Sequence, residues 1–346
     1  MSTNAYTQIV LQNRPITDIL PDTFRVLTKP LQDLQPGPDE VIVKVTYLSL
    51  DPAMRGWLRD TRSYLPPVKI GEVMRAGGLG VIVKIGGNSR HREGDVVIGT
   101  FGWTEYAIMS DKSLETIVPP PGSTALDFLN TLGMPGMTAF FGLHDVGQLK
   151  FGETLVVSGA AGAVGSLVCQ LGKKIGARVI AIAGSQEKCT WLEDELNVDK
   201  ALNYKSPAFQ NEFKEAVGYL DVFFDNVGGD ILDMALSRLK QNARVVLCGG
   251  ISAYNASTPK GLTGYLNLIS QRAKMQGFIV FDYAAQYSRA RSEMAAGLAD
   301  GSIKRKFHVV DGLENAPKAL PMLFSGGNTG KLVVKVSDEA SIGSKL

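Results

Sequence analysis

The feature of this sequence that most constrains its fold is a glycine-rich turn between an apolar run and a helical segment. The run Leu155-Val-Val-Ser-Gly-Ala-Ala-Gly-Ala-Val-Gly165 has the GxGxxG spacing, with Ala160 at the first glycine and Gly159 moving the tight turn by one residue. A missing Cβ lets the backbone approach a pyrophosphate, and the N-terminus of the following helix favours an anion. The pattern predicts the dinucleotide-binding turn of a Rossmann sheet; the alternative is a packing turn without a ligand.

Apolar runs alternate with helical segments after this turn. Runs such as Val-Ile-Ala-Ile-Ala do not alternate with polar residues, which is typical of strands covered by helices on both faces. The order indicates βαβ units and an α/β fold with a doubly wound parallel sheet. Strands are predicted at 154–158, 178–183, 200–203, 220–225, 243–248 and 275–281, and helices near Gly162, Ser185, Ala208, Asp230, Leu262 and Ala284.

A second, β-rich domain is expected, because 346 residues exceed the usual size of one hydrophobic core. The first third of the chain has strand-like runs between turn residues, at 40–50, 78–85 and 94–99. The β character returns after Gly301, and 330–336 has the composition of a strand that rejoins the first domain. We expect residues 1–128 and 311–346 to form this domain, and residues 129–310 to form the Rossmann domain.

Composition and charge exclude several classes of partner. Hydrophobic residues are 45% and charged residues 20% of the sequence, and the formal net charge is +2 without a basic run. Nucleic acid and anionic membrane surfaces are therefore not expected partners. The uncharged stretch 154–172 is long enough for a membrane span, but its glycines and mixed periodicity argue against one. The N-terminal residues do not read as a secretory signal, so a cytoplasmic location is expected.

The cysteines and histidines do not have the spacing of metal ligands. They lie far apart in sequence, without CxxC or HExxH, at Cys169, Cys189, Cys248, His91, His144 and His308. We expect no zinc site, and we expect the thiols to be free and buried, as small hydrophobic residues are in a reducing compartment.

The end of the second predicted strand indicates which nicotinamide cofactor is bound. NAD-binding proteins place an acid there, on the ribose 2′-OH, about 20 residues after the turn. This chain has no acid at that strand end, whereas Ser185 and Lys188 can bind a 2′-phosphate. Tyr204, after the third strand, can contact the adenosine. Although Lys188 could be a solvated helix lysine and Tyr204 an edge aromatic, the missing acid favours NADPH.

Two further strand ends are rich in glycine, Asp225-Asn-Val-Gly-Gly229 and Cys248-Gly-Gly-Ile-Ser-Ala-Tyr-Asn255. Ligands of open α/β sheets bind outside the carboxyl ends of the strands, so both segments face the same crevice as the first turn. Their small residues predict that the nicotinamide half lies over this edge.

Separate motifs along nearly the whole chain carry a family resemblance. They are Tyr47-Leu-Ser-Leu-Asp-Pro-Ala-Met-Arg-Gly56, Leu132-Gly-Met-Pro-Gly-Met-Thr-Ala139, Gly159 to Gly165, Phe224 to Gly229, Cys248 to Asn255, Gly312-Leu-Glu-Asn-Ala-Pro317 and Gly327-Asn-Thr-Gly-Lys331. With them the chain resembles the medium-chain dehydrogenases/reductases of the prostaglandin reductase, leukotriene B4 12-hydroxydehydrogenase and alkenal double-bond reductase group, which includes bacterial curcumin reductase. The cysteine, Gly-His-Glu and four-cysteine ligands of zinc-dependent relatives are absent from the sequence. Ala53 stands where the group commonly has tyrosine, which implies a roomier or differently polar pocket.

The resemblance implies a fold, an assembly and a binding site. The Rossmann domain is inserted into a GroES-like catalytic domain built from both chain ends, and homodimers are usual in the group. Tyr47 and Tyr64 line the substrate pocket. With Ser185 from the strand-end argument, the expected NADPH-binding residues are Gly162, Ala163, Val164, Gly165, Ser185, Lys188, Tyr204, Asn226, Cys248, Gly249, Gly250, Ile251, Ser252, Tyr254, Phe278, Ile279, Val280 and Asn328.

A chain without zinc ligands favours a reaction that needs no Lewis acid. Alcohol oxidation requires a base or a metal for the hydroxyl proton. Reduction of a carbon-carbon double bond conjugated to a carbonyl needs hydride addition at the β-carbon and a donor for the enolate oxygen. Tyr254 is the candidate donor, because a phenol with a pKa near ~10 is protonated at neutral pH. Otherwise Tyr254 is structural and the cofactor ribose donates the hydrogen bond.

The predicted function is therefore NADPH-dependent reduction of α,β-unsaturated aldehydes and ketones, with solvent protonating the α-carbon. Quinone reduction on the same scaffold, and NADPH binding without turnover, are the alternatives. Asp51, Pro52 and Arg55 are interpreted as turn and packing residues.

Overall fold

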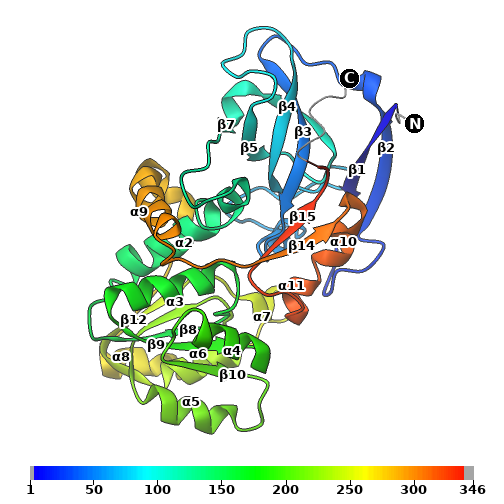
Figure 1. Ribbon diagram of the computed structural model, residues 1–346. Helices are drawn as coiled ribbons and strands as arrows, with labels where there is room; N and C mark the ends of the chain where they lie inside the picture. Colours follow the sequence, from blue (N-terminus) through cyan, green and yellow to red (C-terminus); the bar gives the residue numbers. More distant parts are fainter. Residues whose placement is uncertain (1–3, 339–346) are drawn as a thin grey trace.

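The molecule has two halves, each built on its own sheet (Figure 1). The computed structural model describes residues 4–338, and the strands in this range form three sheets. One half holds a parallel sheet of six strands, and the other holds a sheet of seven strands beside a two-stranded hairpin. This arrangement confirms the expected α/β fold with a separate β-rich domain.

The six-stranded sheet has the order β10-β9-β8-β11-β12-β13, so its first strand along the chain lies in the middle. Its strands are β8 (Thr154–Val157), β9 (Arg178–Ala183), β10 (Lys200–Asn203), β11 (Leu220–Asp225), β12 (Leu239–Leu247) and β13 (Lys274–Gly277). All neighbouring pairs are parallel, and β8 pairs with β9 on one side and β11 on the other. The chain order reverses at β8, and ligands of such sheets bind in the crevice beside this reversal.

Alternate residues of these strands pack into cores on opposite faces of the sheet. In β8, Leu155 and Val157 belong to one core and Val156 to the other, and none of the three is exposed. This two-sided burial explains why the strands read as unbroken apolar runs. The main helices are α2 (Met134–Phe141), α3 (Ala163–Ile175), α4 (Gln186–Asp194), α5 (Phe209–Val217), α6 (Gly229–Leu236), α8 (Asn267–Gln271) and α9 (Tyr287–Ala299).

The β-rich half is assembled from both parts of the chain that flank the parallel sheet. Its strands are β3 (Glu40–Ser49), β4 (Gly77–Ile85), β5 (Val96–Thr100), β6 (Tyr106–Ser110), β7 (Glu115–Thr116), β14 (Phe307–Asp311) and β15 (Lys331–Lys335), with the hairpin β1 (Ala5–Leu11) and β2 (Phe24–Pro30). β15 pairs antiparallel with β3, as expected of a returning tail. β14 already begins at Phe307, and the precise domain boundaries stay a prediction.

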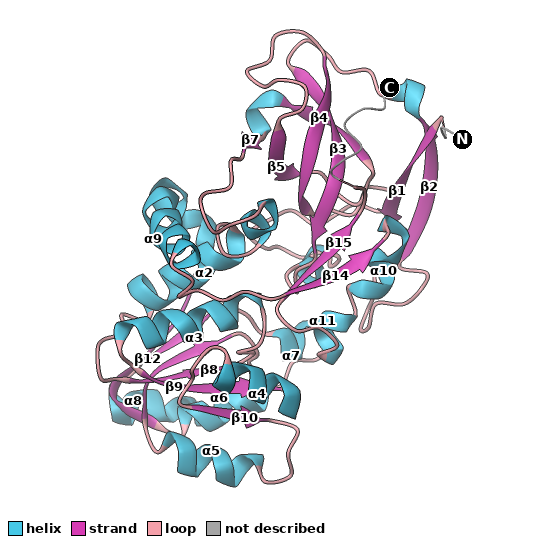
Figure 2. Ribbon diagram, in the orientation of Figure 1, coloured by secondary structure: helices cyan, strands magenta, loops and turns pink. Residues whose placement is uncertain are grey.

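Short helices and turns lie between these elements. Two of them, α7 (Ile251–Tyr254) and α11 (Met322–Ser325), lie between the two main sheets (Figure 2). The others are α1 (Met54–Trp57), α10 (Ala316–Ala319), the 3-10 turns Leu31–Asp33, Asp111–Ser113, Ala125–Leu129, Gly264–Leu266, Val280–Gln286 and Leu313–Asn315, and the π-helical turn Gly142–Val146.

The last βαβ unit differs in detail from the sequence expectation. β12 begins earlier than 243, and β13 ends at Gly277 although the apolar run continues to 281. Gly277 pairs with Leu247, the last residue of β12, so the ladder ends where its partner strand ends. The helix expected near Leu262 begins later, because the Asp233 carboxylate accepts hydrogen bonds from the backbone of Thr263 and Gly264 and holds a turn there.

The stretch 154–172 forms β8, the glycine-rich turn and most of α3, not one long helix. Across residues 4–338, none of the helices combines the length and apolar character needed to cross a bilayer. The expected cytoplasmic location stays a prediction.

Candidate cofactor and substrate site

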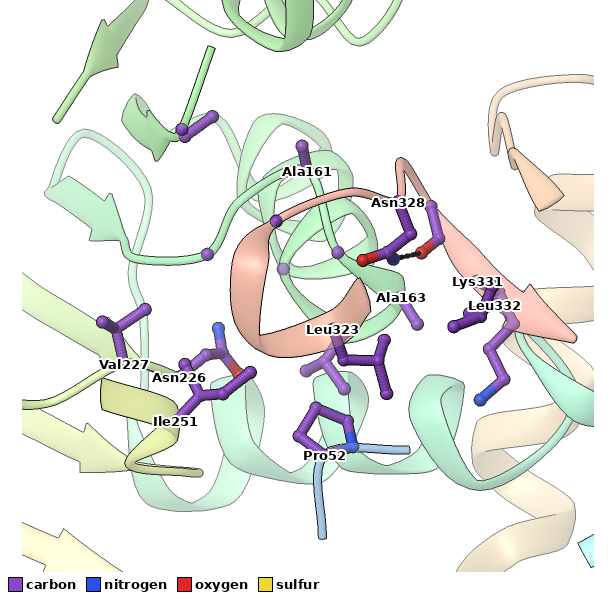
Figure 3. Close-up of a pocket in the computed structure, with 18 of the residues that line it drawn as sticks. Pro52, Ala161, Ala163, Asn226, Val227, Ile251, Leu323, Asn328, Lys331 and Leu332 are labelled. Carbon is purple, nitrogen blue, oxygen red and sulfur yellow. Dashed lines mark hydrogen bonds between the residues drawn. The ribbon is translucent and has the colours of Figure 1, made fainter. Parts of the chain in front are cut away.

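A cleft of about 240 Å³ lies where the carboxyl ends of the parallel strands face the β-rich half (Figure 3). One wall is the glycine-rich turn with Asn226, Val227 and Ile251. The opposite wall comes from the other half of the chain: Leu50, Asp51, Pro52, Leu323, Phe324, Gly326, Asn328, Gly330, Lys331 and Leu332. The cleft therefore lies at the crevice that the strand order predicts.

The glycine-rich turn is shaped by four small residues with different roles. Gly159 has a φ of +59°, a conformation that L side chains rarely adopt. The buried Ala160 follows, and its N–H donates to the carbonyl oxygen of Ile182, 2.9 Å away. A Cβ on Gly165 would lie 2.4 Å from the Gly159 carbonyl oxygen, so α3 can pack this close only with glycine there. Gly162 begins α3 and leaves its first N–H groups facing the cleft.

A buried network fixes the ends of β8 and β11 beside this turn. The Ser158 hydroxyl donates to Asp225 Oδ1 over 2.7 Å, and both side chains are fully buried. Asn226 donates its backbone N–H to Ser158 Oγ (2.8 Å) and its Nδ2 to Ser158 O (2.7 Å). Burial raises the pKa of Asp225, whereas the hydrogen bonds from Ser158, Gly228 and Val227 lower it. The network holds Asn226 in the cleft wall. Ser158, to which Asn226 bonds, was not among the expected site residues.

Two lysines lie near the end of β9. Ser185 caps α4, accepting a hydrogen bond from the Lys188 backbone N–H (3.3 Å), and Lys188 Nζ donates to Gly326 O across the cleft (2.8 Å). Burial lowers the pKa of Lys188, and nearby Lys205 lowers it further. Lys205 Nζ lies 5.9 Å from the centre of the Tyr204 ring, which packs on Gly184. The pair of cations beside an aromatic ring suits an adenosine carrying a 2′-phosphate.

Sequence reasoning missed Lys205. A second cation directly after Tyr204 was the signal that could have identified it as a candidate for binding the 2′-phosphate. In the wall from the chain's far end, sequence reasoning predicted Asn328 but missed Leu323, Phe324 and the other residues around it. There Asn328 Nδ2 donates to Gly330 O over 3.0 Å (Figure 3), and Gly330 N–H donates to Ala161 O over 2.8 Å. The tail thereby binds directly to the glycine-rich turn.

Lys331 forms a buried ion pair at the cleft. Its Nζ lies 2.6 Å from Asp51 Oδ1 and 3.1 Å from Leu50 O, and the side chain is 1% exposed. Ser49 donates to the other carboxylate oxygen of Asp51. These bonds join β15 to the end of β3. Asp51 therefore has a structural role, in line with its interpretation as a turn residue.

Tyr254, at the end of α7, is a half-buried phenol at the boundary between the halves. Its hydroxyl oxygen accepts the Gly250 N–H over 3.2 Å and keeps its own proton to donate. Burial raises the pKa of Tyr254; the bond from Gly250 lowers it, and neighbouring Cys248 and Tyr64 raise it. Tyr64, 47% exposed, comes from the other half, and its ring lies 6.1 Å from that of Phe281. Tyr64 therefore packs against a residue of the Rossmann half that lies far away in the sequence.

The expected site residues divide into two groups. Those that line the cleft are Gly162, Ala163, Val164, Gly165, Lys188, Tyr204, Asn226, Ile251 and Asn328. Those outside its lining are Ser185, Cys248, Gly249, Gly250, Ser252, Tyr254, Phe278, Ile279, Val280, Tyr47 and Tyr64. Several of the second group hold the first in place; for example, Ser252 Oγ donates to Val227 O over 2.6 Å.

Three members of the second group have distinct surroundings. Tyr47 lies within β3, opposite Leu79 and Lys335, and packs against the larger core. Phe278 and Val280 follow the end of β13, where Val280 is buried and Phe278 lies half-buried over Gly142. Their contacts with ligands, and those of the other site residues, stay predictions.

No group of three or more His, Cys, Asp or Glu side chains in residues 4–338 is arranged to hold a metal ion. The three thiols are free, and Cys169 and Cys189 are buried as expected, whereas the Cys248 residue is only partly buried, contrary to the expectation. Burial raises the pKa of Cys248 to about 12, so this thiol beside Tyr254 is protonated at neutral pH.

Comparison with known proteins identifies relatives of the whole chain. Residues 7–117 match the family described as the N-terminal domain of oxidoreductase, and residues 163–296 match the family described as zinc-binding dehydrogenase. The NADPH-dependent curcumin reductase of Escherichia coli (strain K12) is 37% identical over 95% of this chain and 96% of its own length. The NADP(+)-dependent 2-alkenal reductase of Nicotiana tabacum is 38% identical over 88% of this chain and 89% of its own.

The fold is shared with a solved structure over nearly its full length. The crystal structure of CurA from Vibrio vulnificus in complex with NADPH has a TM-score of 0.91 and 40% identity, and the match covers 96% of this chain and 99% of that one. The matched families and the shared fold agree with the motif analysis. The chain belongs to the zinc-independent medium-chain dehydrogenases/reductases of the prostaglandin reductase, alkenal reductase and curcumin reductase group.

Proposed function

We propose that this protein is an NADPH-dependent reductase of the carbon-carbon double bond of α,β-unsaturated aldehydes and ketones. The observation that carries the proposal is the place of Tyr254 at the end of α7, where Arg59 of the other half bonds to its carbonyl oxygen, with a hydroxyl that accepts the Gly250 N–H and keeps its own proton to donate. A neutral donor at such a site can stabilise negative charge that develops on a carbonyl oxygen. The names of the curcumin and alkenal reductase relatives support the same class of substrate.

The cleft suits NADPH in shape and charge. The glycine-rich turn and the N-terminus of α3 can take the pyrophosphate, while Lys188 and Lys205 can neutralise a 2′-phosphate. NADPH supplies a hydride when bound. Asn226, held by Ser158, orients the wall on which the nicotinamide half would rest.

Tyr254 performs the proton chemistry on the substrate oxygen in this proposal. Bound NADPH would supply the hydride for the β-carbon and become NADP+, and the π electrons of the double bond would move to the carbonyl oxygen. Tyr254 would donate a hydrogen bond to the resulting enolate oxygen. Water then protonates the α-carbon, which yields the saturated carbonyl. The Gly250 N–H, 3.2 Å from the Tyr254 oxygen, keeps the hydroxyl in the site.

The test is NADPH oxidation followed at 340 nm with a 2-alkenal, an aliphatic enone, an aromatic enone and a simple quinone, with product identification. Turnover of the enals and enones to saturated carbonyls, insensitive to EDTA and much weaker with NADH, supports the proposal. Faster turnover of the quinone than of every enone favours quinone reduction. Tight NADPH binding without turnover favours a protein that only binds the cofactor.

Replacing Lys205 with alanine is expected to raise the Kd for NADPH about tenfold and leave the Kd for NADH unchanged. The removed ammonium group would otherwise contribute about one charge-assisted hydrogen bond to the 2′-phosphate. Binding is measured by quenching of protein fluorescence. Lys214→Ala, an exposed lysine on α5, is the control and should bind both nucleotides normally. Equal weakening of NADH and NADPH by Lys205→Ala would contradict the 2′-phosphate assignment.

We also propose that two copies of the chain form a homodimer through the β13 edge of the parallel sheet. Within residues 4–338 this strand pairs with β12 alone, so its other edge is unpaired. Leu266 and Ile269 beside it are 59% and 73% exposed. Ile269→Asp should produce monomers in size-exclusion chromatography with light scattering, while Val118→Asp, also on a highly exposed residue, should not. A dimeric Ile269→Asp variant would place the interface elsewhere.

A further inference from the structure

Two arginines of the β-rich half bind three consecutive residues beside the proposed proton donor. Arg59 Nη2 donates to the carbonyl oxygens of Tyr254 (2.8 Å) and Ala256 (3.0 Å). Arg55 Nε donates to Asn255 Oδ1 (3.0 Å). The partners are about 200 residues apart in sequence, so these bonds form only when the two halves are in contact.

The side chain of Asn255 extends this contact to a third segment. Its Nδ2 donates to Asp18 Oδ1 over 2.9 Å. Arg55 also donates to the backbone carbonyls of Pro15, Ile16 and Thr17, at distances of 2.7 to 3.2 Å. Hydrogen bonds therefore connect three segments: the loop before β2, the helix α1 and the end of α7. We call the bonds of Arg55 and Arg59 to residues 254–256 the arginine clasp.

The burial of Arg55 is unusual for a residue that only fills space. Its side chain is fully buried, and its hydrogen bonds go to carbonyl and amide oxygens, while no carboxylate forms an ion pair with it among the described residues. Burial lowers the pKa of Arg55, nearby Arg59 lowers it further, and Asp18 raises it. A buried cation without a contacting anion is a poor source of stability. Its fixed geometry is better explained by what it holds, which is the loop 15–17 and, through Asn255, the residue that follows α7.

The start and the end of the segment that carries Tyr254 are held by different parts of the molecule. At its start the N–H and Oγ of Ser252 both donate to Val227 O (3.1 and 2.6 Å), whereas its end is held by the arginine clasp and by Asp18. Helix α7 spans Ile251–Tyr254, a single turn that is too short to be stable alone. It follows Gly249 and Gly250, whose backbones have more conformational freedom than other residues. The one hydrogen bond of the Tyr254 hydroxyl found in residues 4–338 comes from Gly250 of the same segment. The bonds made by residues 254–256 therefore contribute to the direction of the phenol, together with the bonds of Ser252 at the start of α7.

We propose that Arg55 and Arg59 are positioning residues, which set the place of the Tyr254 hydroxyl by clasping residues 254–256 across the boundary between the halves. The proposal rests on the proton-donor role proposed for Tyr254. It assigns a function to the arginines of the segment 54–59 beyond packing, and it makes the contact between the halves part of the assembly of the reactive site. A displacement of a donor by about 1 Å can slow a reaction about a hundredfold.

Arg59 offers the sharper variants, because it is half-buried and lies at the surface end of the clasp. Arg59→Ala removes both bonds to the backbone, whereas Arg59→Lys keeps a charge that can reach one of the two carbonyls. Arg62→Ala makes the same change of charge three residues away, at an exposed side chain without a hydrogen bond or ion pair in the described structure. Asn255→Ala tests the Arg55 arm without removing a buried charge.

We expect Arg59→Ala to lower kcat ten- to a hundredfold, roughly the cost of a misplaced group, with the Kd for NADPH within about threefold of wild type. Arg59→Lys should recover part of the loss, Asn255→Ala should show a smaller loss, and Arg62→Ala should match wild type. Titration of NADPH-binding sites gives kcat per intact site. A variant that merely folds less well would have fewer sites but an unchanged kcat per site, and that result would overturn the proposal.

Amide hydrogen exchange followed by mass spectrometry tests the clasp without any substrate. Peptides covering 249–256 should exchange at least about tenfold faster in Arg59→Ala than in wild type or Arg62→Ala, because their backbone is no longer held. Unchanged exchange in this segment would overturn the proposal even if kcat fell. If wild type reduced no enone, the proposed function would fail, and the exchange experiment would still decide whether the clasp holds the segment.

Discussion

Tyr254→Phe is expected to lower kcat for enone reduction about a hundredfold or more, the usual effect of removing a donor to a developing oxyanion. The Kd for NADPH should stay within about threefold, because the ring remains. Loss of the hydroxyl also leaves the Gly250 N–H without its partner and should lower the free energy of unfolding by about 1 kcal/mol. Steady-state kinetics, cofactor titration and thermal unfolding measure the three quantities separately.

The matched control is Tyr219→Phe, since Tyr219 is 58% exposed and lies under Arg238 on the surface of the Rossmann half. It should change neither kcat nor stability appreciably. The raised pKa of Tyr254 adds a second signature: the group donates while protonated, so kcat should stay level to about pH 9 and fall only at higher pH. A normal kcat in Tyr254→Phe would make the tyrosine structural and leave the cofactor ribose as the donor.

Gly165→Ala should raise the Kd for NADPH about five- to 150-fold, the equivalent of about 1–3 kcal/mol of overpacking. The added Cβ would lie 2.4 Å from the Gly159 carbonyl oxygen and 2.8 Å from Ala160 Cα, both of them backbone atoms that cannot turn aside. The first helical turn of α3 must then move away from residues 159 and 160, and its N–H groups no longer point at the pyrophosphate. Isothermal titration with NADPH and thermal unfolding report the change.

Gly261→Ala is the control for this substitution, because a Cβ there meets nothing within 4 Å. It should bind NADPH as wild type does. If Gly165→Ala also bound NADPH normally, the α3 N-terminus would not be the pyrophosphate site, and the glycine would serve packing alone.

Much of the fold followed from local patterns. The six parallel strands were each predicted within a few residues, since an apolar run buried on both faces leaves a clear signature. The returning strand β15 and the glycine-rich turn were found in the same way. The hairpin β1–β2 was not distinguished from irregular structure; in β2 most side chains are exposed and give no alternation to detect.

The candidate site was only partly predictable. Gly162, Lys188 and Tyr204 were found because a binding turn and a strand end restrict which residues can stand there. Lys205 was missed, since a single lysine on a surface loop has no pattern of its own. Leu323 and Phe324 line the cleft from α11, a helix too short to be recognised and placed only by the return of the chain.

By itself, the sequence determined the order of the elements, the parallel sheet and the turn that can hold a dinucleotide, because these depend on residues close together in the chain. Only the tertiary structure decided which side chains meet across the boundary between the halves. Tyr64 beside Phe281, Lys331 on Asp51 and Arg59 on the carbonyl of Tyr254 join residues from separate segments. Hydrophobic periodicity records which face of an element is buried, but it does not record which polar atoms the packed elements bring together.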